Sequence, residues 1–426
     1  MTEDRHSFEV LVVGGGPAGM AAAASAAQAG AHVGVADDNP SFGGQIWRGQ
    51  ETSPSTDLAK LWYQRFQGAK VECLRGCRVF GAEEEKTLVA ETFDGWAELR
   101  FNKLILATGA RERFLPFPGW TLPNVMGAGG LQAVVKSGVK IRDRRVVIAG
   151  TGPLLLAVAA HLKRDGAEIC VVAEQASWNR LLRFGLGLTG QPSKLRQAIG
   201  LKRDLSGVKF VANCWPLAAE GSDRLESVTL LSGSTTWKVP CDYLACGFHL
   251  VPNAELAVLL GCILADGFVQ IDDLQRTSVH DVYCAGEPTG IGGLELSLVE
   301  GQIAGYAAAG NPEKAKSLFA RRSTLRKFVA RMDRTFALNR ELRSLTGDDT
   351  LVCRCEDVEF GRLREHWSWR SAKLHTRCGM GPCQGRICGP ALEFLLGWRV
   401  ESIRPPVFPA RVGSLAMAPE SHAKQC

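Results

Sequence analysis

The chain has 426 residues, of which 46% are hydrophobic and 22% charged, so it can form two or three domains that each bury a core. The net charge of +6 is modest and most Lys and Arg residues are scattered, which argues against nucleic acid as the main partner. Fourteen cysteines, and an acidic N-terminus unlike a signal peptide, indicate reduced thiols or metal ligands in a cytoplasmic protein, either free or peripheral at the inner membrane.

The first predicted elements form a βαβ unit. A strand at residues 8–13 is followed by an Ala-rich helix to about Gln28 and by a second strand at residues 32–36. The stretch from Leu11 to Ala36 contains no Asp, Glu, Lys or Arg, but several glycines and a proline interrupt it. A buried strand-turn-helix explains this stretch better than a membrane span, so we expect no transmembrane segment.

A glycine-rich turn joins the first strand to the helix. Its residues are Gly14, Gly16, Pro17, Ala18 and Gly19. Gly14 permits a tight turn, Gly16 lets the backbone approach a pyrophosphate, and Gly19 lets the helix pack on the strand. The helix N-terminus then offers free N–H groups to phosphates. Asp37, or Asp38 in its place, stands where a ribose hydroxyl would be bound, so we expect a dinucleotide site here.

Three later segments place this turn in a wider pattern. They are Gly43-Gly44-Gln45-Ile46-Trp47, Ala107-Thr108-Gly109 and Val282-Tyr283-Cys284-Ala285-Gly286-Glu287. Together with the turn, their order resembles the flavoproteins with two dinucleotide-binding domains, the superfamily of glutathione and thioredoxin reductases. This resemblance implies an α/β fold with two Rossmann-like domains and FAD in the first. It implies that the FAD contacts include Gly44, Gln45, Thr108, Gly109, Gly286 and Glu287. Glu287 would contact the ribityl chain, where the family more often has Asp.

The βαβ pattern recurs, with Gly150 lying 136 residues after Gly14. Predicted strands at residues 145–149 and 168–173 flank Gly150, Gly152 and a helix to about residue 163, and Glu174 could hold an adenosine ribose. Leu155 replaces the third glycine, and we expect its side chain to push the helix away from the strand. Three outcomes stay open: a working NAD(P)H site, a site for FMN, NAD or another adenine nucleotide, or a structural relic.

No catalytic side chain can be assigned. Disulfide reductases of this superfamily need a cysteine pair beside the flavin. We expect the two spaced pairs in the flavoprotein part to be buried as small apolar residues; these are Cys73 with Cys77 and Cys241 with Cys246. The eight histidines are isolated in the sequence and none stands in a recognisable acid/base pair.

Five cysteines gather between Cys353 and Cys388. Two close pairs of thiolates can hold a [2Fe–2S] centre, and we assign as its ligands Cys353, Cys355, Cys383 and Cys388. Cys378 is a fifth cysteine and a substitute ligand. Structural zinc sites favour Cys-x2–4-Cys spacing, which Cys353-x-Cys355 does not have, so zinc and free thiols remain the alternatives.

Two segments around these cysteines have a distinctive sequence pattern. They are Val352-Cys353-Arg354-Cys355-Glu356-Asp357 and Thr376-Arg377-Cys378-Gly379-Met380-Gly381-Pro382-Cys383-Gln384-Gly385-Arg386. They resemble the bacterioferritin-associated-ferredoxin-type module. Fused behind this flavin fold, they resemble the α subunits of bacterial opine oxidases, D-hydroxyproline dehydrogenase and hydrogen cyanide synthase, and the resemblance covers nearly the whole chain.

The resemblance implies a division of labour. In such complexes a β subunit of the D-amino-acid-oxidase type oxidises an amine or imino acid, such as an opine or D-hydroxyproline, at its own flavin. The α subunit passes the electrons through FAD and the iron–sulfur centre to an acceptor, and a small ferredoxin-like subunit is a further partner. The alternatives are a self-sufficient NAD(P)H-dependent oxidoreductase and, from another class, a redox-sensing or partner-docking module.

The expected domain order follows from these motifs. It comprises a discontinuous FAD-binding domain at 1–118 and 245–310, a second dinucleotide-binding domain at 119–244, a helical linker at 311–345, a small helical [2Fe–2S] module at 346–400 and a tail at 401–426. The linker is rich in Arg and is predicted to form an amphipathic helix with a solvated basic face, or else a subunit-docking helix.

Overall fold

The computed structural model describes residues 2–83, 86–188, 192–400 and 402–417, and these divide into two compact units. The first unit contains the described residues of Met1–Arg111, Val251–Val329 and Ser402–Cys426. The second contains those of Glu112–Leu250 and Ala330–Glu401. The cysteine-rich region at 346–400 thus belongs to the same unit as the second βαβ pattern. The part of the tail that the structure describes belongs to the first unit.

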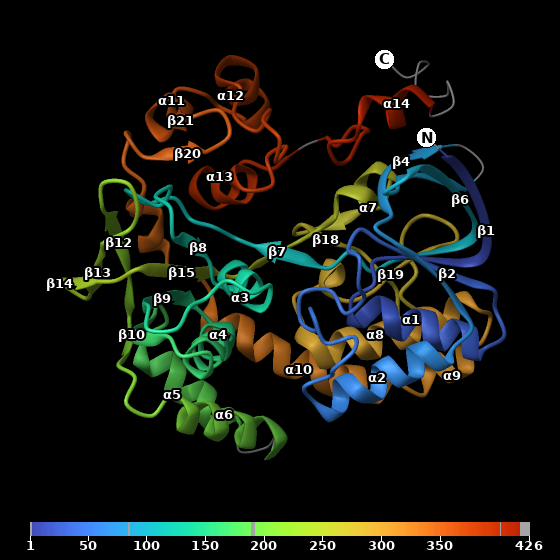
Figure 1. The fold of residues 1–426 in the computed structure, drawn as a ribbon, viewed down its shortest axis with the longest axis horizontal. Helices are drawn as coiled ribbons and strands as arrows, with labels where there is room; N and C mark the ends of the chain where they lie inside the picture. Colours follow the sequence, from blue (N-terminus) through green and yellow to red (C-terminus); the bar gives the residue numbers. More distant parts are fainter. Residues whose placement is uncertain (1, 84–85, 189–191, 401, 418–426) are drawn as a thin grey trace. The chain divides into compact units, whose positions relative to one another are not determined.

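The first unit is built on a sheet of seven described strands (Figure 1). The strand order is β3 (Val71–Arg75), β2 (Val33–Asp37), β1 (Thr2–Val13), β6 (Gly95–Leu106), β5 (Thr87–Glu91) and β4 (Arg78–Glu83), with β19 (Val282–Cys284) also paired to β6. Strands β3, β2, β1, β6 and β19 are parallel, whereas β4 and β5 add an antiparallel meander. This parallel core is the predicted Rossmann-like domain, and β1 begins earlier than the predicted Phe8.

Helices α1 (Pro17–Gln28), α2 (Asp57–Gly68) and α8 (Gly293–Ala308) lie together along this sheet (Figure 1). A Cβ atom on Gly301 would lie 2.2 Å from the carbonyl oxygen of Ala18, and one on Gly305 would lie 2.2 Å from that of Ala22. Glycine in α8 and alanine in α1 therefore let the two helix backbones approach closely. This packing helps to explain why residues 11–36 carry no charged side chains: most of them lie in buried parts of β1, α1 and β2.

The second unit has a parallel sheet with four helices beside it. The strand order is β11 (Phe210–Ala212), β10 (Glu168–Glu174), β9 (Arg145–Thr151), β15 (Tyr243–Phe248) and β8 (Val125–Gly127). The helices are α3 (Ala128–Lys136), α4 (Pro153–Arg164), α5 (Trp178–Gly187) and α6 (Pro192–Asp204). An antiparallel meander follows, made of β12 (Cys214–Glu220), β13 (Ser227–Ser232) and β14 (Thr235–Pro240). This is the predicted second Rossmann-like domain.

Leu155, at the place of the third motif glycine, is buried in α4. A Cβ atom on Gly247 of β15 would lie 3.1 Å from its Cδ2 atom. The leucine is therefore accommodated where the neighbouring strand has no side chain. The side chain that Leu155 adds to the helix is thus accommodated by the absence of a side chain at Gly247 on the strand.

The cysteine-rich region forms a small helical module in the second unit. Its elements are β20 (Leu351–Cys353), β21 (Val358–Glu359), α11 (Phe360–Arg364), α12 (Trp369–Thr376) and α13 (Cys388–Leu396). Trp369, Leu363 and Leu392 pack with three of the cysteines in one buried cluster. The Trp120 indole N–H donates to the Leu351 carbonyl at 2.6 Å, which ties the module to the rest of its unit.

The Arg-rich helix α10 (Phe319–Phe336) precedes the cysteine module in the chain and is followed by the 3₁₀ turn η2 (Arg340–Leu345). Arg321, Lys327 and Arg334 are exposed, as expected for a basic face. Arg322 differs from that expectation, because its side chain is only 5% exposed and donates to Asp273 at 2.6 Å. At least one basic side chain of this helix is therefore buried in an ion pair and is not part of a solvated basic face.

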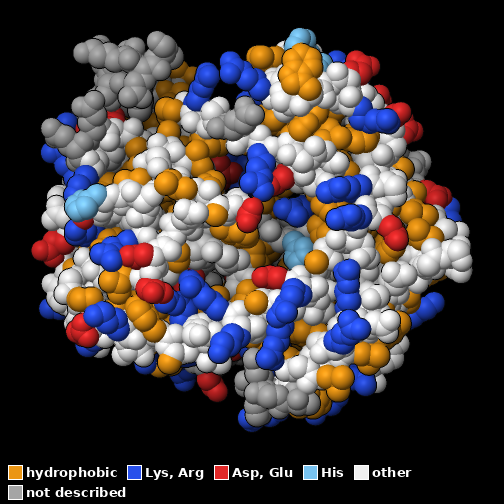
Figure 2. Space-filling view, turned by 180° about the vertical axis from the view of Figure 1, so that it is seen from behind, with side chains coloured by type: hydrophobic (Ala, Val, Ile, Leu, Met, Phe, Trp, Pro, Cys, Tyr) orange, Lys and Arg blue, Asp and Glu red, His pale blue; other side chains and the backbone are white. Residues whose placement is uncertain are grey.

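The remaining short elements complete the two units. They are β7 (Ala110–Glu112), β16 (Leu250–Pro252), α7 (Glu255–Leu259), β17 (Leu264–Ala265), β18 (Phe268–Val269), η1 (Glu287–Thr289), α9 (Pro312–Lys316) and α14 (Val412–Met417). Among the described residues, no helix has both the length and the apolar character needed to span a bilayer. On the face drawn in Figure 2, Lys and Arg side chains alternate with acidic, apolar and neutral ones.

Candidate functional site

The predicted glycine-rich turn lies between β1 and α1, at the carboxyl end of the parallel strands. Gly14 has φ +108°, and a Cβ atom there would lie 2.2 Å from the Ala107 carbonyl oxygen. A Cβ atom on Gly19 would lie 1.8 Å from the Gly14 carbonyl oxygen. Only glycine fits either position, as the motif predicts. Gly16 is the N-cap of α1 and, having no side chain, leaves the N–H groups at the start of the helix uncapped by its own residue.

Asp37 ends β2 beside this turn. Its carboxylate accepts hydrogen bonds from the amide of Gly15 and, at 2.8 Å each, from the backbone and side-chain nitrogens of Asn39. Asp38 faces elsewhere, accepting from Asn39 Nδ2 at 2.8 Å and lying 3.8 Å from the Arg78 guanidinium. Burial, followed by the neighbouring Asp37 charge, raises the pKa of Asp38. The structure thus places Asp37, and not Asp38, against the glycine turn.

Residues distant in sequence converge on the same turn. A Cβ atom on Gly44 would lie 3.0 Å from the Cα atom of Gly16, and one on Gly286 would lie 2.8 Å from the Cβ atom of Ala18. The Gly43-Gly44-Gln45 and Gly286-Glu287 segments are therefore both held against the start of α1. Such backbone-lined cradles suit a large flat cofactor with a pyrophosphate, so these residues fit FAD.

The Glu287 carboxylate also forms hydrogen bonds within this cradle. Its carboxylate accepts from the amide of Gly292 at 3.2 Å and from that of Gly293 at 2.9 Å, at the N-terminus of α8. Negative charge at a helix N-terminus is stabilising, and the longer reach of Glu relative to Asp suits this position. The contact positions the Gly286-Glu287 segment next to α1.

One residue in this region was missed by sequence reasoning. Asn253 donates from Nδ2 to the Thr108 carbonyl at 2.9 Å, and its own carbonyl accepts from Thr108 Oγ1 at 2.6 Å. Arg111 donates to Asn253 Oδ1 at 2.8 Å. The predicted Thr108-Gly109 segment is thus held by a reciprocal pair of hydrogen bonds. No local motif marks Asn253, because its partner lies 145 residues away.

The second predicted dinucleotide site has the expected turn geometry. Gly150 has φ +143° and Gly152 has φ +96°. Glu174, which is 3% exposed, accepts from the Gly152 amide at 2.7 Å, from Thr151 Oγ1 at 2.8 Å and from the Ala176 amide at 2.8 Å. Burial raises the pKa of Glu174, while these donors act to lower it. Glycines and acid therefore meet, as in the first site.

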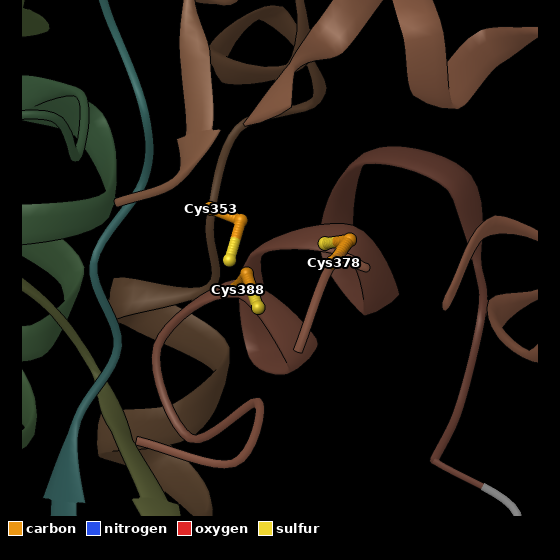
Figure 3. Close-up of side chains that lie close together, drawn as sticks. All are labelled: Cys353, Cys378 and Cys388. Atoms are coloured by element: carbon orange, nitrogen blue, oxygen red, sulfur yellow. The ribbon is translucent and has the colours of Figure 1, made fainter. Parts of the chain in front are cut away.

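The five clustered cysteines form two groups in the module. The Sγ atoms of Cys353, Cys378 and Cys388 all lie within 4.8 Å of one another, and all three residues are buried (Figure 3). Cys355, which is exposed, lies beside Cys383. The sequence pairs Cys353 with Cys355 and Cys383 with Cys388, whereas in space Cys353 lies by Cys388 and Cys355 lies by Cys383.

The surroundings favour the thiolate form at Cys353, whereas they raise the pKa of the Cys355, Cys378 and Cys388 thiols. Hydrogen bonds from the thiols of Cys378 and Cys388 lower the pKa of Cys353 to about 2. Burial acts to raise the pKa of Cys353, and the backbone amides of Gly379 and Glu356 act with the two thiols to lower it. Hydrogen bonds to cluster sulfurs from backbone N–H groups are a recurring feature of iron–sulfur sites. The donor set therefore fits a [2Fe–2S] cluster.

Outside the module, the cysteines that the structure describes are free thiols. Cys77, Cys241 and Cys246 are buried, as predicted, and burial raises the pKa of each thiol. The prediction is wrong for Cys73, which is exposed on strand β3. Cys73 lies on the edge strand β3, whose side chains are all exposed or only partly buried, and the sequence spacing to Cys77 does not reveal this.

Comparison with known proteins agrees with this description. The family described as "Pyridine nucleotide-disulphide oxidoreductase" matches residues 8–310. The HcnB subunit of hydrogen cyanide synthase from Pseudomonas protegens is 31% identical, over 90% of this chain and 90% of its own. An opine oxidase subunit of Rhizobium meliloti strain 1021 is 32% identical, over 96% of this chain and 98% of its own. The L-proline dehydrogenase from P. horikoshii has the same fold, with a TM-score of 0.68 at 17% identity over 97% of this chain and 80% of its own.

Proposed function

The chain belongs to the pyridine nucleotide-disulphide oxidoreductase family, and from that premise we propose that it is an electron-transfer α subunit of an amine or imino-acid dehydrogenase. A partner β subunit of the D-amino-acid-oxidase type oxidises the substrate at a CH–NH or CH–NH2 bond, and a small ferredoxin-like subunit is a further partner. The substrate class is that of opines or D-hydroxyproline. We place the complex in the cytoplasm, free or peripheral at the inner membrane.

One observation carries this proposal: three buried cysteines that could together hold a metal ion lie in the same chain as the pyridine nucleotide-disulphide oxidoreductase fold. Bound FAD would accept electron pairs and a bound [2Fe–2S] cluster would carry single electrons. The two relatives named above are subunits of enzymes by their names, and they align with 90% and 96% of this chain. No acid/base pair is needed in a subunit that only relays electrons.

In this proposal the first glycine turn holds FAD. Gly14, Gly16 and Gly19 admit the pyrophosphate at the start of α1, and Asp37 binds the ribose of the adenosine half. The rest of the cofactor is lined by Gly44, Gln45, Thr108, Gly109, Gly286 and Glu287. Since Glu287 also holds the N-terminus of α8, its contact with the ribityl chain would fix that helix to the flavin.

The cluster ligands we propose are Cys353, Cys355, Cys383 and Cys388. Cys353 and Cys388 lie together on the buried side, and Cys355 and Cys383 lie together on the exposed side, so each close pair would hold one iron. Cys378 contacts the buried pair and is kept as a thiol that donates to Cys353. The exposed pair is the side from which an electron acceptor can approach.

The experiment that tests this function is reconstitution of the purified chain with iron and sulfide under anaerobic conditions. We expect about two irons per chain, bound FAD, and an electron paramagnetic resonance signal after reduction with dithionite. A Cys73→Ser variant is the matched control, because Cys73 is an exposed thiol outside the module. Retention of one zinc ion and no iron would contradict the proposal.

A further inference from the structure

The segment that follows α10 lies on the carboxyl ends of three neighbouring strands of the second unit. The main-chain carbonyl of Phe336 accepts from His249 Nε2 at 2.7 Å, from Thr151 Oγ1 at 3.2 Å and from Gln175 Nε2 at 3.3 Å. Thr151 ends β9, Gln175 follows β10 and His249 follows β15. One carbonyl oxygen thus receives a donor from each of the three strands at the centre of the sheet.

Further contacts fix the four residues Phe336–Asn339, here called the strap segment. The side chain of Gln175 is fully buried, and its Oε1 accepts from the Asn339 amide at 3.0 Å while Asn339 Nδ2 donates to the Gln175 carbonyl at 2.9 Å. Arg180 donates to the Ala337 carbonyl at 3.1 Å. The Phe336 and Phe184 rings pack edge to face, with 5.4 Å between their centroids. The strap segment is therefore held by both its backbone and its side chains.

The position of the strap segment is the one that a dinucleotide would need. In open parallel sheets, ligands bind outside the carboxyl ends of the strands, with the pyrophosphate at the glycine turn. Thr151 is the middle residue of the Gly150-Thr151-Gly152 turn, and its hydroxyl contacts both Glu174 and the Phe336 carbonyl. The strap segment thus bonds directly to the turn that would bind phosphate.

The hydrogen bonds that the acidic residue accepts from its glycine turn do not by themselves distinguish the two sites. Asp37 accepts a bond from its glycine turn just as Glu174 does. The difference is the peptide carbonyl of Phe336, which is held over the second turn by donors from three strands. A nucleotide entering there would have to displace the strap segment and leave Gln175, which is buried, without its partners.

We propose that the strap segment closes the second dinucleotide-type site, so that the resting chain takes up neither NAD(P)H nor another adenine nucleotide there. The second unit then serves as a platform that anchors the connection between α10 and the cysteine module. Of the outcomes that the sequence leaves open for this site, the structure assigns the structural one. Neither the iron–sulfur cluster nor a partner protein takes part in this closure.

The test is equilibrium binding of NADH and, separately, of ATP to the full-length FAD-loaded chain. Nucleotide binding would be followed by fluorescence, and the strap segment by hydrogen exchange of the peptide that contains it. For the wild type we expect no saturable binding of either nucleotide up to about 1 mM. A Kd of about 1 mM corresponds to only about 4 kcal/mol of binding free energy. We also expect no change in exchange of the strap peptide. Saturable binding of either nucleotide to the wild type would overturn the proposal.

A variant tests whether the strap segment itself is the cause. Gln175→Ala removes the side-chain bonds to Phe336 and Asn339 and should speed exchange of the strap peptide and raise nucleotide affinity at least tenfold. Gln197→Ala, an exposed residue on α6, is the matched control and should change neither. If Gln175→Ala does not fold, Asn339→Ala removes one bond from the other side. A variant whose strap peptide exchanges freely while NADH and ATP still fail to bind would also overturn the proposal.

Discussion

A Cβ atom on Gly381 would lie 2.3 Å from the Cβ atom of Cys355 and 3.4 Å from its sulfur. Gly381 therefore lets the second cysteine segment of the module pass directly over the exposed thiol pair. Its backbone is not in the left-handed region, so the reason for glycine here is space alone. The loop that carries Cys383 can reach Cys355 only because position 381 has no side chain.

The first prediction follows from this contact. Gly381→Ala should displace Cys355 from Cys383 and lower the iron content of the reconstituted chain severalfold, while bound FAD stays unchanged, because FAD is proposed to bind in the other unit. Iron and flavin analysis of the purified variant checks this. Gly200→Ala, on α6 with open space at its Cβ position, is the control and should load iron normally. Normal iron content in Gly381→Ala would refute the assigned role of Cys355.

The second prediction separates the five thiols. Cys383→Ser should abolish the visible absorption of the cluster and leave FAD bound, because it removes a proposed ligand. Cys378→Ser should retain the cluster, because a serine hydroxyl can still donate to the Cys353 sulfur. Visible spectra and electron paramagnetic resonance of the two variants, prepared side by side, decide the matter. Loss of the cluster in Cys378→Ser would show that the proposed ligand set is wrong.

The third prediction concerns the FAD site. A Cβ atom on Gly19 would lie 1.8 Å from the Gly14 carbonyl, so Gly19→Ala should separate α1 from the turn. Overpacking of this kind costs about 1–3 kcal/mol of folding stability. If that whole cost fell on the FAD-bound state, FAD affinity would drop about fivefold to 150-fold. Fluorescence titration of the apoprotein with FAD measures it. Gly68→Ala, at an open position in α2, serves as the control. Unchanged FAD affinity in a folded Gly19→Ala variant would argue against this site.

The fourth prediction is a pH dependence of stability. Asp281 is 8% exposed and forms ion pairs with Lys103 and Lys86. Burial acts to raise the pKa of Asp281, but the hydrogen bonds and charges of the two lysines lower it to about 2. Since an unfolded Asp titrates near about 3.9, the stabilisation is complete above about pH 4 and is lost as pH falls from about 4 to 2.

Asp281→Asn should therefore destabilise the chain at pH 7, on the order of 1 kcal/mol, and should show less additional loss below pH 4 than the wild type does. Urea unfolding at pH 7 and pH 3 measures both effects. Asp223→Asn, at an exposed position, is the control. Equal pH dependence in Asp281→Asn and the wild type would mean that the two lysines do not stabilise this carboxylate.

Much of the fold could be predicted because its signals are local. The helix predicted to end near Gln28 does end there, and the strand predicted from Arg145 is β9, because glycine turns and alanine-rich packing faces are encoded within a few residues. The meander β12–β14 was missed, since it lies between motifs. The antiparallel pairing that creates it depends on contacts across the chain.

The arrangement of the cysteines could be predicted only in part. Spacing indicated that the five thiols would gather, and they do in two groups. Which thiols lie together could not be read from spacing, because the loop passing Gly381 crosses the two sequence pairs. The strap segment was also invisible in the sequence. The contact at its centre is made by the main-chain carbonyl of Phe336, which leaves no residue pattern.

We propose that this chain relays electrons from a partner protein and does not take them from NAD(P)H. The most direct measurement is the visible spectrum of the FAD-loaded, reconstituted chain under anaerobic conditions, with and without its β subunit. We predict that NADH leaves the flavin band unchanged, and that an opine or D-hydroxyproline bleaches it only when the β subunit is present. Bleaching of the isolated chain by NADH would contradict the account and make the protein a self-sufficient NADH-dependent oxidoreductase.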